Sequence, residues 1–482
     1  MEVLQRTANR GSIATGGYEI ANSLKFEPDN TEYMRRSNGT NGNQRVFTQS
    51  MWIKRTEISD SYATPWSVGS LGFRFGSDDS LRVWCYTYDG IGAGTSNVDS
   101  YRIITPNKFR DTSAWYHLVF ALDTTQSTES DRLKVYVNNE RVYHNGSSDV
   151  YDQTITQNSY TRCNGTGNSS QNWNQIGWWW SGSYVFAGYI AEVNFVDGLQ
   201  LSPTDVGEYD EDSGIWKPKK YDGAYGTNGY YLKFDDASDL GKDSSGNNND
   251  MNSIGNITAA DQATDTPTNN FCTFNPLMTQ NNPPTISEGA MKSTGGGGTW
   301  NNTWGNMGVK NGKWYYEMKA TNTSYTGYFG ASTAPAEGSN TTGASVAYNT
   351  SFWVGEANSI DYYYWQNGSL TANESTGWGG FSNNDVLGLA LDLDSSTKKF
   401  YLYKNGSLLN SGGTNLPTNM QDEFVFPLYV QYENRQDELN FGGYTISTIS
   451  SAASDANGYG TFEYAPPSGY YALCTKNLAE YG

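Results

Sequence analysis

Histidine is almost missing from this chain of 482 residues, which contains only His117 and His144. A serine–histidine–aspartate triad or a histidine-rich metal site therefore has almost no residues to draw on. His117 alternates with Trp115 and Val119 along an apolar run, which is typical of a packed residue in a β-sandwich. No G-x-S-x-G nucleophile motif is present either. The sequence thus argues against catalysis by an activated serine.

Long apolar segments are also lacking. No stretch approaches the roughly 18 residues that a membrane-spanning helix needs, so we expect no membrane insertion. The first residues, MEVLQRTANRGSIATGG, contain no apolar core of a secretory signal, although the composition is that of an outward-facing protein. A virion protein that assembles in a cytoplasm and is released by lysis satisfies both observations, and so does a cytosolic protein.

Charged residues make up only 17% of the chain, and they sum to −19 at pH 7. A surface of this sign repels phosphate backbones, so we expect no nucleic-acid partner. An acidic chain binds divalent cations readily, which leaves calcium open as a cofactor. The four cysteines (Cys85, Cys163, Cys272 and Cys474) show no C-x-x-C spacing, so zinc is not indicated and we expect free, buried thiols.

Aromatic residues, in contrast, are abundant. The 36 Tyr and 15 Trp supply the area for a folded core. Residues 115–142 and 386–409 each contain two runs of β-branched and aromatic residues separated by an acidic turn. The second run of each ends in a turn, at Asn138 and at Asn405, where asparagine tolerates the positive φ of a tight hairpin. Short strands recur through both halves and predict an all-β protein with two antiparallel β-sandwich domains in tandem.

Composition along the chain predicts four segments. Residues 1–20 are polar and are interpreted as an arm for attachment to a virion, and residues 21–240 form the first sandwich. Residues 241–285 are rich in Asn, Asp, Ser, Thr and Pro and indicate a connector. Residues 286–482 form the second sandwich and end in an extended tail.

Several of these strands resemble known families. In the first half, WYHLVFALDTT, LKVYVNNERV and FAGYIAEVNFVDGLQLSPTDVGE resemble the laminin G-like, concanavalin A-type jelly roll. In the second half, GKWYYEMKA, DVLGLALDLD, KKFYLYKNGSLL and FPLYVQYENRQDELNFGG resemble a SPRY (B30.2) domain. The stretch YDGAYGTNGYYLKFDDASDLGKDSSGNNND and the tail APPSGYYALCTKNL are similar to segments of large bacteriophage virion proteins that carry both modules.

This resemblance implies a tail-fibre, head-fibre or adhesin protein on the virion surface, with other virion proteins as partners and a homotrimer as the favoured assembly. It implies binding to a host-surface polysaccharide or protein, without catalysis. Two alternatives stay open: a capsid decoration or fibre-spacer protein without a ligand, and a polysaccharide depolymerase. Concanavalin A-type glycosidases place paired carboxylates on one strand face. The nearest match, residues 208–212, ends in Asp and lies in a charged stretch, so we expect no enzyme.

Aromatic clusters are the favoured ligand-binding residues, because rings stack on the C–H faces of sugars. Trp178 and Trp180 belong to one cluster, although strand alternation also fits a place in the core for part of it. The SPRY resemblance implies binding by loops at one end of the sandwich. It points to Trp353, Trp365 and Tyr432.

The laminin G-like resemblance also implies that calcium can bind at a loop rim through Asp side chains. Asp123, Asp152 and Asp197 are the candidate ligands, but nothing in their spacing is diagnostic. The acidic stretch DSSGNNND does not resemble an EF-hand loop.

Overall fold

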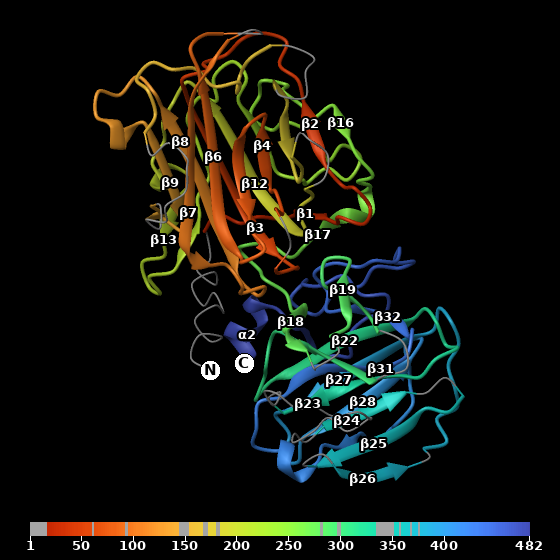
Figure 1. The fold of residues 1–482 in the computed structure, drawn as a ribbon. Coiled ribbons are helices and arrows are strands. Elements are labelled where there is room, and N and C mark those ends of the chain that lie inside the picture. Colours follow the sequence, from red (N-terminus) through yellow and green to blue (C-terminus); the bar gives the residue numbers. More distant parts are fainter. Residues whose placement is uncertain are drawn as a thin grey trace. The chain divides into compact units, whose positions relative to one another are not determined.

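The chain folds into two compact units, one ending at Thr268 and the other beginning at Asn269. The computed structural model describes residues 17–482 except 60–61, 92–94, 144–153, 167–171, 180–183, 280–282, 296–299, 334–350, 356–357, 367–368 and 375. Antiparallel β-sheets dominate each unit (Figure 1), which confirms the predicted all-β class with two sandwiches in tandem. No helix in the described part of the chain has the length and hydropathy to cross a membrane.

Two large sheets form the N-terminal unit. Sheet 1 has the order β10 (Glu140–Arg141), β9 (Leu133–Val137), β8 (Trp115–Asp123), β3 (Val46–Arg55), β12 (Gly188–Asp197), β1 (Ser23–Phe26) and β17 (Gln262–Ala263), and β15 (Tyr230–Leu232) also pairs with β12. Sheet 2 has the order β16 (Ser253–Ile254), β2 (Met34–Arg36), β11 (Asn174–Ile176), β4 (Trp66–Val68), β5 (Leu71–Phe75), β6 (Ser80–Tyr88) and β7 (Asn97–Lys108). A separate hairpin joins β13 (Gly207–Tyr209) to β14 (Trp216–Pro218).

The core of this unit lies between the two sheets. Phe47 and Phe120 of sheet 1 and Trp66 and Phe73 of sheet 2 belong to one cluster of fully buried residues. The rings of Trp66 and Phe120 meet edge to face, with centroids 5.5 Å apart. Side chains alternate along a strand, so the residues between these core positions point away from it. The cysteines of the chain are free and buried, as expected.

The two predicted hairpins use asparagine in the same way. Strands β8 and β9 pair with Leu118 opposite Val137, and Asn138 follows with φ 49°. Its Oδ1 accepts a hydrogen bond from the backbone N–H of His117 at 2.7 Å. In the C-terminal unit, Asn405 has φ 48° and its Oδ1 accepts from the N–H of Val386 at 2.9 Å. In both units, therefore, the asparagine bonds its turn to the neighbouring strand of the sheet, β8 in one unit and the strand of Val386 in the other.

Strand β12 contains a bulge that the alternation of its residues does not reveal. Its pairing with β3 shifts between Ala191 and Asn194, and Glu192 has φ 52°. Ile190 before the bulge and Val193 after it both face the core. The bulge lets Glu192 turn its carboxylate away from that core, where the hydroxyl of Tyr231 donates a hydrogen bond to it at 2.7 Å.

Two further sheets form the C-terminal unit. Sheet 3 has the order β18 (Phe274–Thr279), β21 (Trp300–Gly305), β31 (Phe426–Tyr432), β23 (Gly327–Ser332), β24 (Ser351–Gly355), β25 (Asp361–Gln366) and β26 (Ser369–Glu374). Sheet 4 has the order β19 (Thr285–Ser287), β20 (Lys292–Thr294), β32 (Gln436–Asn440), β22 (Lys313–Ala320), β27 (Val386–Asp392), β28 (Lys399–Lys404) and β29 (Ser407–Leu408), while β30 (Thr414–Asn415) pairs with β28. Phe352 of sheet 3 stacks on Phe400 of sheet 4, with centroids 4.4 Å apart, so the second core also lies between two sheets.

The segment 241–285, predicted as a connector, is divided between the two units. Before Thr268 it supplies β16 and β17, which pair with β2 and β1 of the N-terminal sandwich. After Asn269 it supplies β18, which pairs with β21 of the C-terminal sandwich. Polar composition did not reveal these strands, because edge strands need few apolar residues. The arm, residues 1–20, lies outside the described residues up to residue 16.

The C-terminal tail differs from the extended form that we predicted. Strand β33 (Tyr471–Ala472) pairs in parallel with β22, and helix α2 (Thr475–Tyr481) follows. Asn477 on this helix is fully buried, and its Nδ2 donates to Asp455 Oδ2 at 2.8 Å and to the carbonyl of Ala472 at 2.9 Å. Buried hydrogen bonds thus hold the end of the chain as a helix.

Candidate functional site

The outer face of sheet 2 carries one continuous cross-strand row. Register partners from β2 to β7 follow in the order Arg35, Gln175, Ser67, Gly72, Trp84 and Arg102. Five inter-strand steps of about 4.8 Å make this row roughly 24 Å long. A Cβ at Gly72 would lie 2.3 Å from the carbonyl oxygen of Trp66, so glycine is required there. The middle of the row is buried, and the hydroxyl of Ser67 donates a hydrogen bond to the carbonyl of Trp178 at 2.8 Å.

Arg35 lies among three aromatic rings at one end of the row. Its guanidinium carbon is 4.3 Å from the ring centroid of Trp173, 5.1 Å from that of Tyr33 and 5.9 Å from that of Trp178. The rings of Tyr33 and Trp178 are themselves 4.0 Å apart. All four side chains are partly exposed. A cation over aromatic faces is attracted to their π electrons, so this end presents a positive charge framed by ring surface.

Arg74 on β5 occupies a more enclosed site near the other end. Its guanidinium lies over Trp179, Tyr184, Tyr62 and Trp84, at 3.5, 4.7, 5.3 and 5.6 Å from their centroids. The side chain is only 6% exposed, and burial lowers the pKa of Arg74 to about 10. Its Nε has no hydrogen-bond acceptor among the described residues. Aromatic rings thus surround this cation in place of a carboxylate.

Positive charge prevails over the whole outer face of sheet 2. Its strands contain one acidic residue, Asp99, which is buried and accepts hydrogen bonds from Thr87 and Thr156. Arg82 on β6 pairs with Asp78, at 3.3 Å, in the turn before that strand. We call the outward set Arg35, Arg74, Arg82, Arg102, Trp84, Trp173 and Trp178 the arginine face. It is a basic surface on a chain of net charge −19.

Sequence reasoning found this surface only in part. Trp178, predicted as a binding residue, lies on the arginine face, whereas Trp180 lies outside the described residues. The arginines were missed because their strands are distant in sequence and meet only through sheet register. A local signal exists in LRVWCYTY, where Arg82 and Trp84 alternate with the buried Leu81 and Val83.

A second aromatic surface lies on sheet 3 of the C-terminal unit and includes all three residues predicted there. Tyr432 contacts Trp300, Trp300 stacks on Tyr328, Tyr328 contacts Trp353 and Trp353 stacks on Trp365, with centroid distances of 5.0, 5.9, 5.6 and 5.2 Å. Trp353 is only 1% exposed and supports the chain of rings from beneath. Trp365 and Tyr432 are partly exposed, and their role in ligand binding stays a prediction.

The predicted calcium ligands do not form a cluster in the described structure. Asp197 is buried and accepts hydrogen bonds from the N–H groups of Asn43 and Asn228 and from the side chain of Asn164, at 2.8–3.0 Å. Asp123 accepts hydrogen bonds from Thr125 and Gln126 in its own turn, and Asp152 lies outside the described residues. Among the residues that can be placed, no group of three His, Cys, Asp or Glu is arranged to hold a metal ion.

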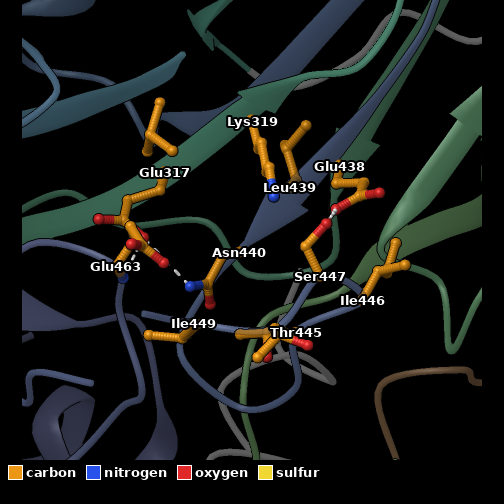
Figure 2. A pocket seen from close by; sticks show the side chains of 12 residues that line it. Glu317, Lys319, Glu438, Leu439, Asn440, Thr445, Ile446, Ser447, Ile449 and Glu463 are labelled. Atoms are coloured by element: carbon orange, nitrogen blue, oxygen red, sulfur yellow. Dashed lines mark hydrogen bonds between the residues drawn. The ribbon is translucent and has the colours of Figure 1, made fainter. Parts of the chain in front are cut away.

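A small pocket in the C-terminal unit gathers acidic side chains (Figure 2). Glu317 and Lys319 of β22 and Glu438 of β32 line it, together with Glu463 and the segment 445–449. Paired carboxylates in a pocket are the arrangement that a depolymerase would need. The pocket is therefore the place in the described structure at which to look for that chemistry.

Glu317 is held in place within this pocket. Its Oε1 accepts hydrogen bonds from the N–H of Tyr464 and the hydroxyl of Tyr315, and its Oε2 accepts from the N–H of Glu463 and from Asn440, at 2.9–3.2 Å. The side chain is only 2% exposed, and burial raises the pKa of Glu317 to about 7, although these four donors oppose that rise. Both oxygens are already bonded, so Glu317 anchors residues 463–464 and has no oxygen directed to a substrate.

Known proteins resemble the two sandwiches only in architecture. No protein-family model matches the sequence, and neither does any curated protein. Similar solved structures include the SPRY domain of human HERC1 (15% identity, 36% of this chain, 99% of that chain, TM-score 0.26). They also include the carbohydrate-binding module CBM66 from Bacillus subtilis (10%, 35%, 91%, 0.24) and an SAP-like pentraxin from Limulus polyphemus (14%, 39%, 82%, 0.24). Likeness at these identities and TM-scores does not transfer a function.

Proposed function

We propose that this protein is a non-catalytic glycan-binding protein of a bacteriophage virion, with the arginine face as its binding surface. The observation that carries glycan binding is the outward placement of Trp84, Trp173 and Trp178 on one sheet, none of them within the core cluster. Indole rings stack on the C–H faces of sugars, and all three of these side chains are partly exposed.

A glycan microarray probed with the full chain tests this proposal. We expect binding to host-surface polysaccharides that falls at least fivefold in W84A and in W178A. Tyr143 is 63% exposed and follows the edge strand β10 of the other sheet, so Y143A is the matched control and should bind as the wild type does. Binding that is equal in all variants would place the glycan site elsewhere, and no binding at all would favour the fibre-spacer alternative.

The virion assignment rests on the sequence resemblance of the segment after residue 220 and of the tail to phage virion proteins. A virion supplies other virion proteins as partners, and a homotrimer would raise the avidity of weak sites without new contacts. Mass spectrometry of purified particles tests the location and copy number. Ile20 is buried and Tyr18 donates a hydrogen bond to Glu192, so these two residues belong to the N-terminal unit and the arm is best tested by deletion of residues 1–16. This deletion should abolish incorporation while both units stay folded, and a truncated chain that still incorporates would contradict the attachment role.

The proposal also excludes catalysis. The bonded state of both Glu317 oxygens supports this point, because a general acid must be able to give its proton to a glycosidic oxygen. We expect no release of reducing ends from any polysaccharide that the chain binds. Release that disappears in E317Q would instead establish the depolymerase alternative.

A further inference from the structure

A buried polar cluster on β1 of the N-terminal unit places Lys25 between the carboxyl groups of Glu32 and Asp261. We propose that Lys25 and Asp261 join in an intramolecular amide bond, an isopeptide cross-link, with Glu32 as the acid–base catalyst. This covalent modification would form within the folded chain and needs no other molecule. It does not depend on the glycan-binding function proposed above.

The three side chains lie close together in a dry site. Nζ of Lys25 is 2.9 Å from Oδ1 of Asp261 and 3.0 Å from Oε1 of Glu32. The side chains of Lys25, Glu32 and Asp261 are 1%, 2% and 8% exposed. The amine therefore stays beside the carboxyl carbon, which is one bond beyond Oδ1, and such fixed proximity raises the effective concentration of reacting groups. Burial also favours the products, because a neutral amide replaces two desolvated charges.

Glu32 has the properties of a proton carrier for this reaction. One lysine cannot neutralise two buried carboxylates, so the pair of acids retains a proton more readily than either would alone. Burial raises the pKa of Glu32 to about 7, in spite of the opposing charge of Lys25. Oε1 accepts hydrogen bonds from Lys25 and from Asn30, whereas the buried Oε2 has no partner among the described residues. A carboxyl group that exchanges its proton near neutral pH, next to the amine, suits general acid–base catalysis.

The other oxygen of Asp261 is held by two donors. The backbone N–H of Thr258 donates to Oδ2 at 2.7 Å, and the hydroxyl of Thr258 donates to it at 3.1 Å. Both bonds belong to the capping of the short 3₁₀ helix η5 (Ala259–Asp261). Donors at this oxygen stabilise the negative charge that develops when an amine attacks the carboxyl carbon. Oδ2 is therefore the future amide oxygen, and Oδ1 is the oxygen that leaves.

The reaction balances without a further reactant. Lys25 passes one ammonium proton to Glu32, and the neutral Nζ attacks Cγ of Asp261. A second proton of Nζ follows the same route, so that two protons reach Oδ1 through Glu32. The Nζ–Cγ bond forms, the Cγ–Oδ1 bond breaks and Oδ1 leaves as water. An ammonium and a carboxylate thus become one amide and one water molecule, and Glu32 returns to its initial state.

The positions of the two residues give the bond a structural role. Lys25 lies on β1, the first strand of the unit, and Asp261 directly precedes β17, which pairs with β1 shortly before the unit ends at Thr268. The amide would close most of the unit into a covalent loop. A pull on the two ends of the unit would then load this bond instead of the hydrogen bonds between strands. Loop closure also stabilises a fold, because it restricts the unfolded chain.

Mass spectrometry of the denatured full chain tests the inference. We expect an intact mass that is lower than the sequence mass by one water molecule. A protease digest should contain a branched peptide that joins Lys25 to Asp261. The full sequence mass, in a preparation that circular dichroism shows to be folded, would leave an ordinary ion pair and overturn the inference. Loss of water within a linear peptide, or a branch at the other buried pair of Lys54 and Asp265, would also overturn it.

Variants assign the roles of the three residues. K25R lacks the amine and D261A lacks the carboxyl group, so each should have the full mass of its own sequence. E32Q keeps both reacting groups and should slow bond formation by about a hundredfold or more, which leaves freshly purified protein at its full mass. The exposed pair of Lys220 and Asp222 supplies the matched control, and D222A should lose water as the wild type does.

Two results with these variants would contradict the proposal. A water loss that persists in K25R or D261A would place the reaction at other residues. A folded E32Q chain that forms the branched peptide as fast as the wild type would remove Glu32 from the catalysis. Because a variant that does not fold also does not react, the branched peptide of the wild type remains the deciding observation.

Discussion

The indole N–H of Trp216 donates a hydrogen bond to Nδ1 of His117 at 3.0 Å. The other ring nitrogen, Nε2, lies 2.8 Å from Oγ of Ser50, so the neutral imidazole carries its proton on Nε2 and donates it to the serine. Trp52 stacks on the same ring, with centroids 4.7 Å apart. His117 is fully buried, and burial lowers its pKa to about 3. The histidine is thus a neutral packing residue, as its alternating sequence context predicted.

The state of His117 predicts a stability that depends on pH. An unfolded chain protonates this residue near pH 6.5, whereas the folded unit excludes the proton down to about pH 3. The contribution of His117 to the free energy of unfolding is therefore lost as the pH falls through this window, by about 1.4 kcal/mol for each pH unit. We expect the difference in unfolding free energy between wild type and H117Q to follow this slope and to be constant above about pH 7. Urea unfolding followed by tryptophan fluorescence measures this difference at each pH. Unfolding free energies of wild type and H117Q that change in parallel with pH would contradict the buried neutral state.

Glu192 predicts a pH dependence of opposite sign. Tyr231 and Tyr18 donate hydrogen bonds to its carboxylate at 2.7 and 2.9 Å, and burial raises the pKa of Glu192 to about 7. A raised pKa stabilises the fold fully below the ordinary value of 4.5, and this stability is lost as the pH rises to about 7. Wild type should therefore lose melting temperature relative to E192Q across that range. The exposed Glu140 provides the control E140Q, which should track wild type at every pH.

Asp265 predicts a large effect of breaking a buried ion pair. Its Oδ2 lies 2.7 Å from Nζ of Lys54, both side chains are at most 1% exposed, and its Oδ1 accepts from Trp115 at 3.1 Å. D265N removes the carboxylate that pairs with this buried lysine and should destabilise the N-terminal unit by about 3–5 kcal/mol. The exposed pair of Lys220 and Asp222 is the control, and D222N should cost less than about 1 kcal/mol. Chemical denaturation compares them; similar losses would show that burial of the Lys54 pair is unimportant.

Trp353 and Trp365 are expected to separate stability from binding in the C-terminal unit. W353A removes a ring that is 1% exposed and should destabilise the unit by about 3–5 kcal/mol. W365A removes a partly exposed ring, so it should reduce the free energy of unfolding less than W353A does. It should also weaken the binding of any ligand that packs on sheet 3. Differential scanning calorimetry gives the first quantity and the glycan array the second. A larger stability loss for W365A would contradict the burial pattern.

The candidate site shows where sequence reasoning was limited. Aromatic clusters pointed to Trp178 and to the rings of sheet 3, because stretches rich in Tyr and Trp are visible in the sequence itself. Arg35, Arg74 and Arg102 carry no such signal, since each stands alone among unlike neighbours. They share one face of sheet 2 only when β2, β5 and β7 take their places in it. The hydrogen bond from Trp216 to His117 was equally hidden, because it joins residues 99 positions apart.

The all-β class and the turns at Asn138 and Asn405 are readable from local sequence, because they depend on strand alternation and on the backbone preference of single residues. The bulge at Glu192 and the row that ends at Arg35 and Arg102 become visible only in the folded sheets. Both arise from register between strands distant in the chain. That register is set by the burial of a whole sheet face, and the free energy of this burial depends on residues from many strands. A short stretch of sequence therefore does not predict it.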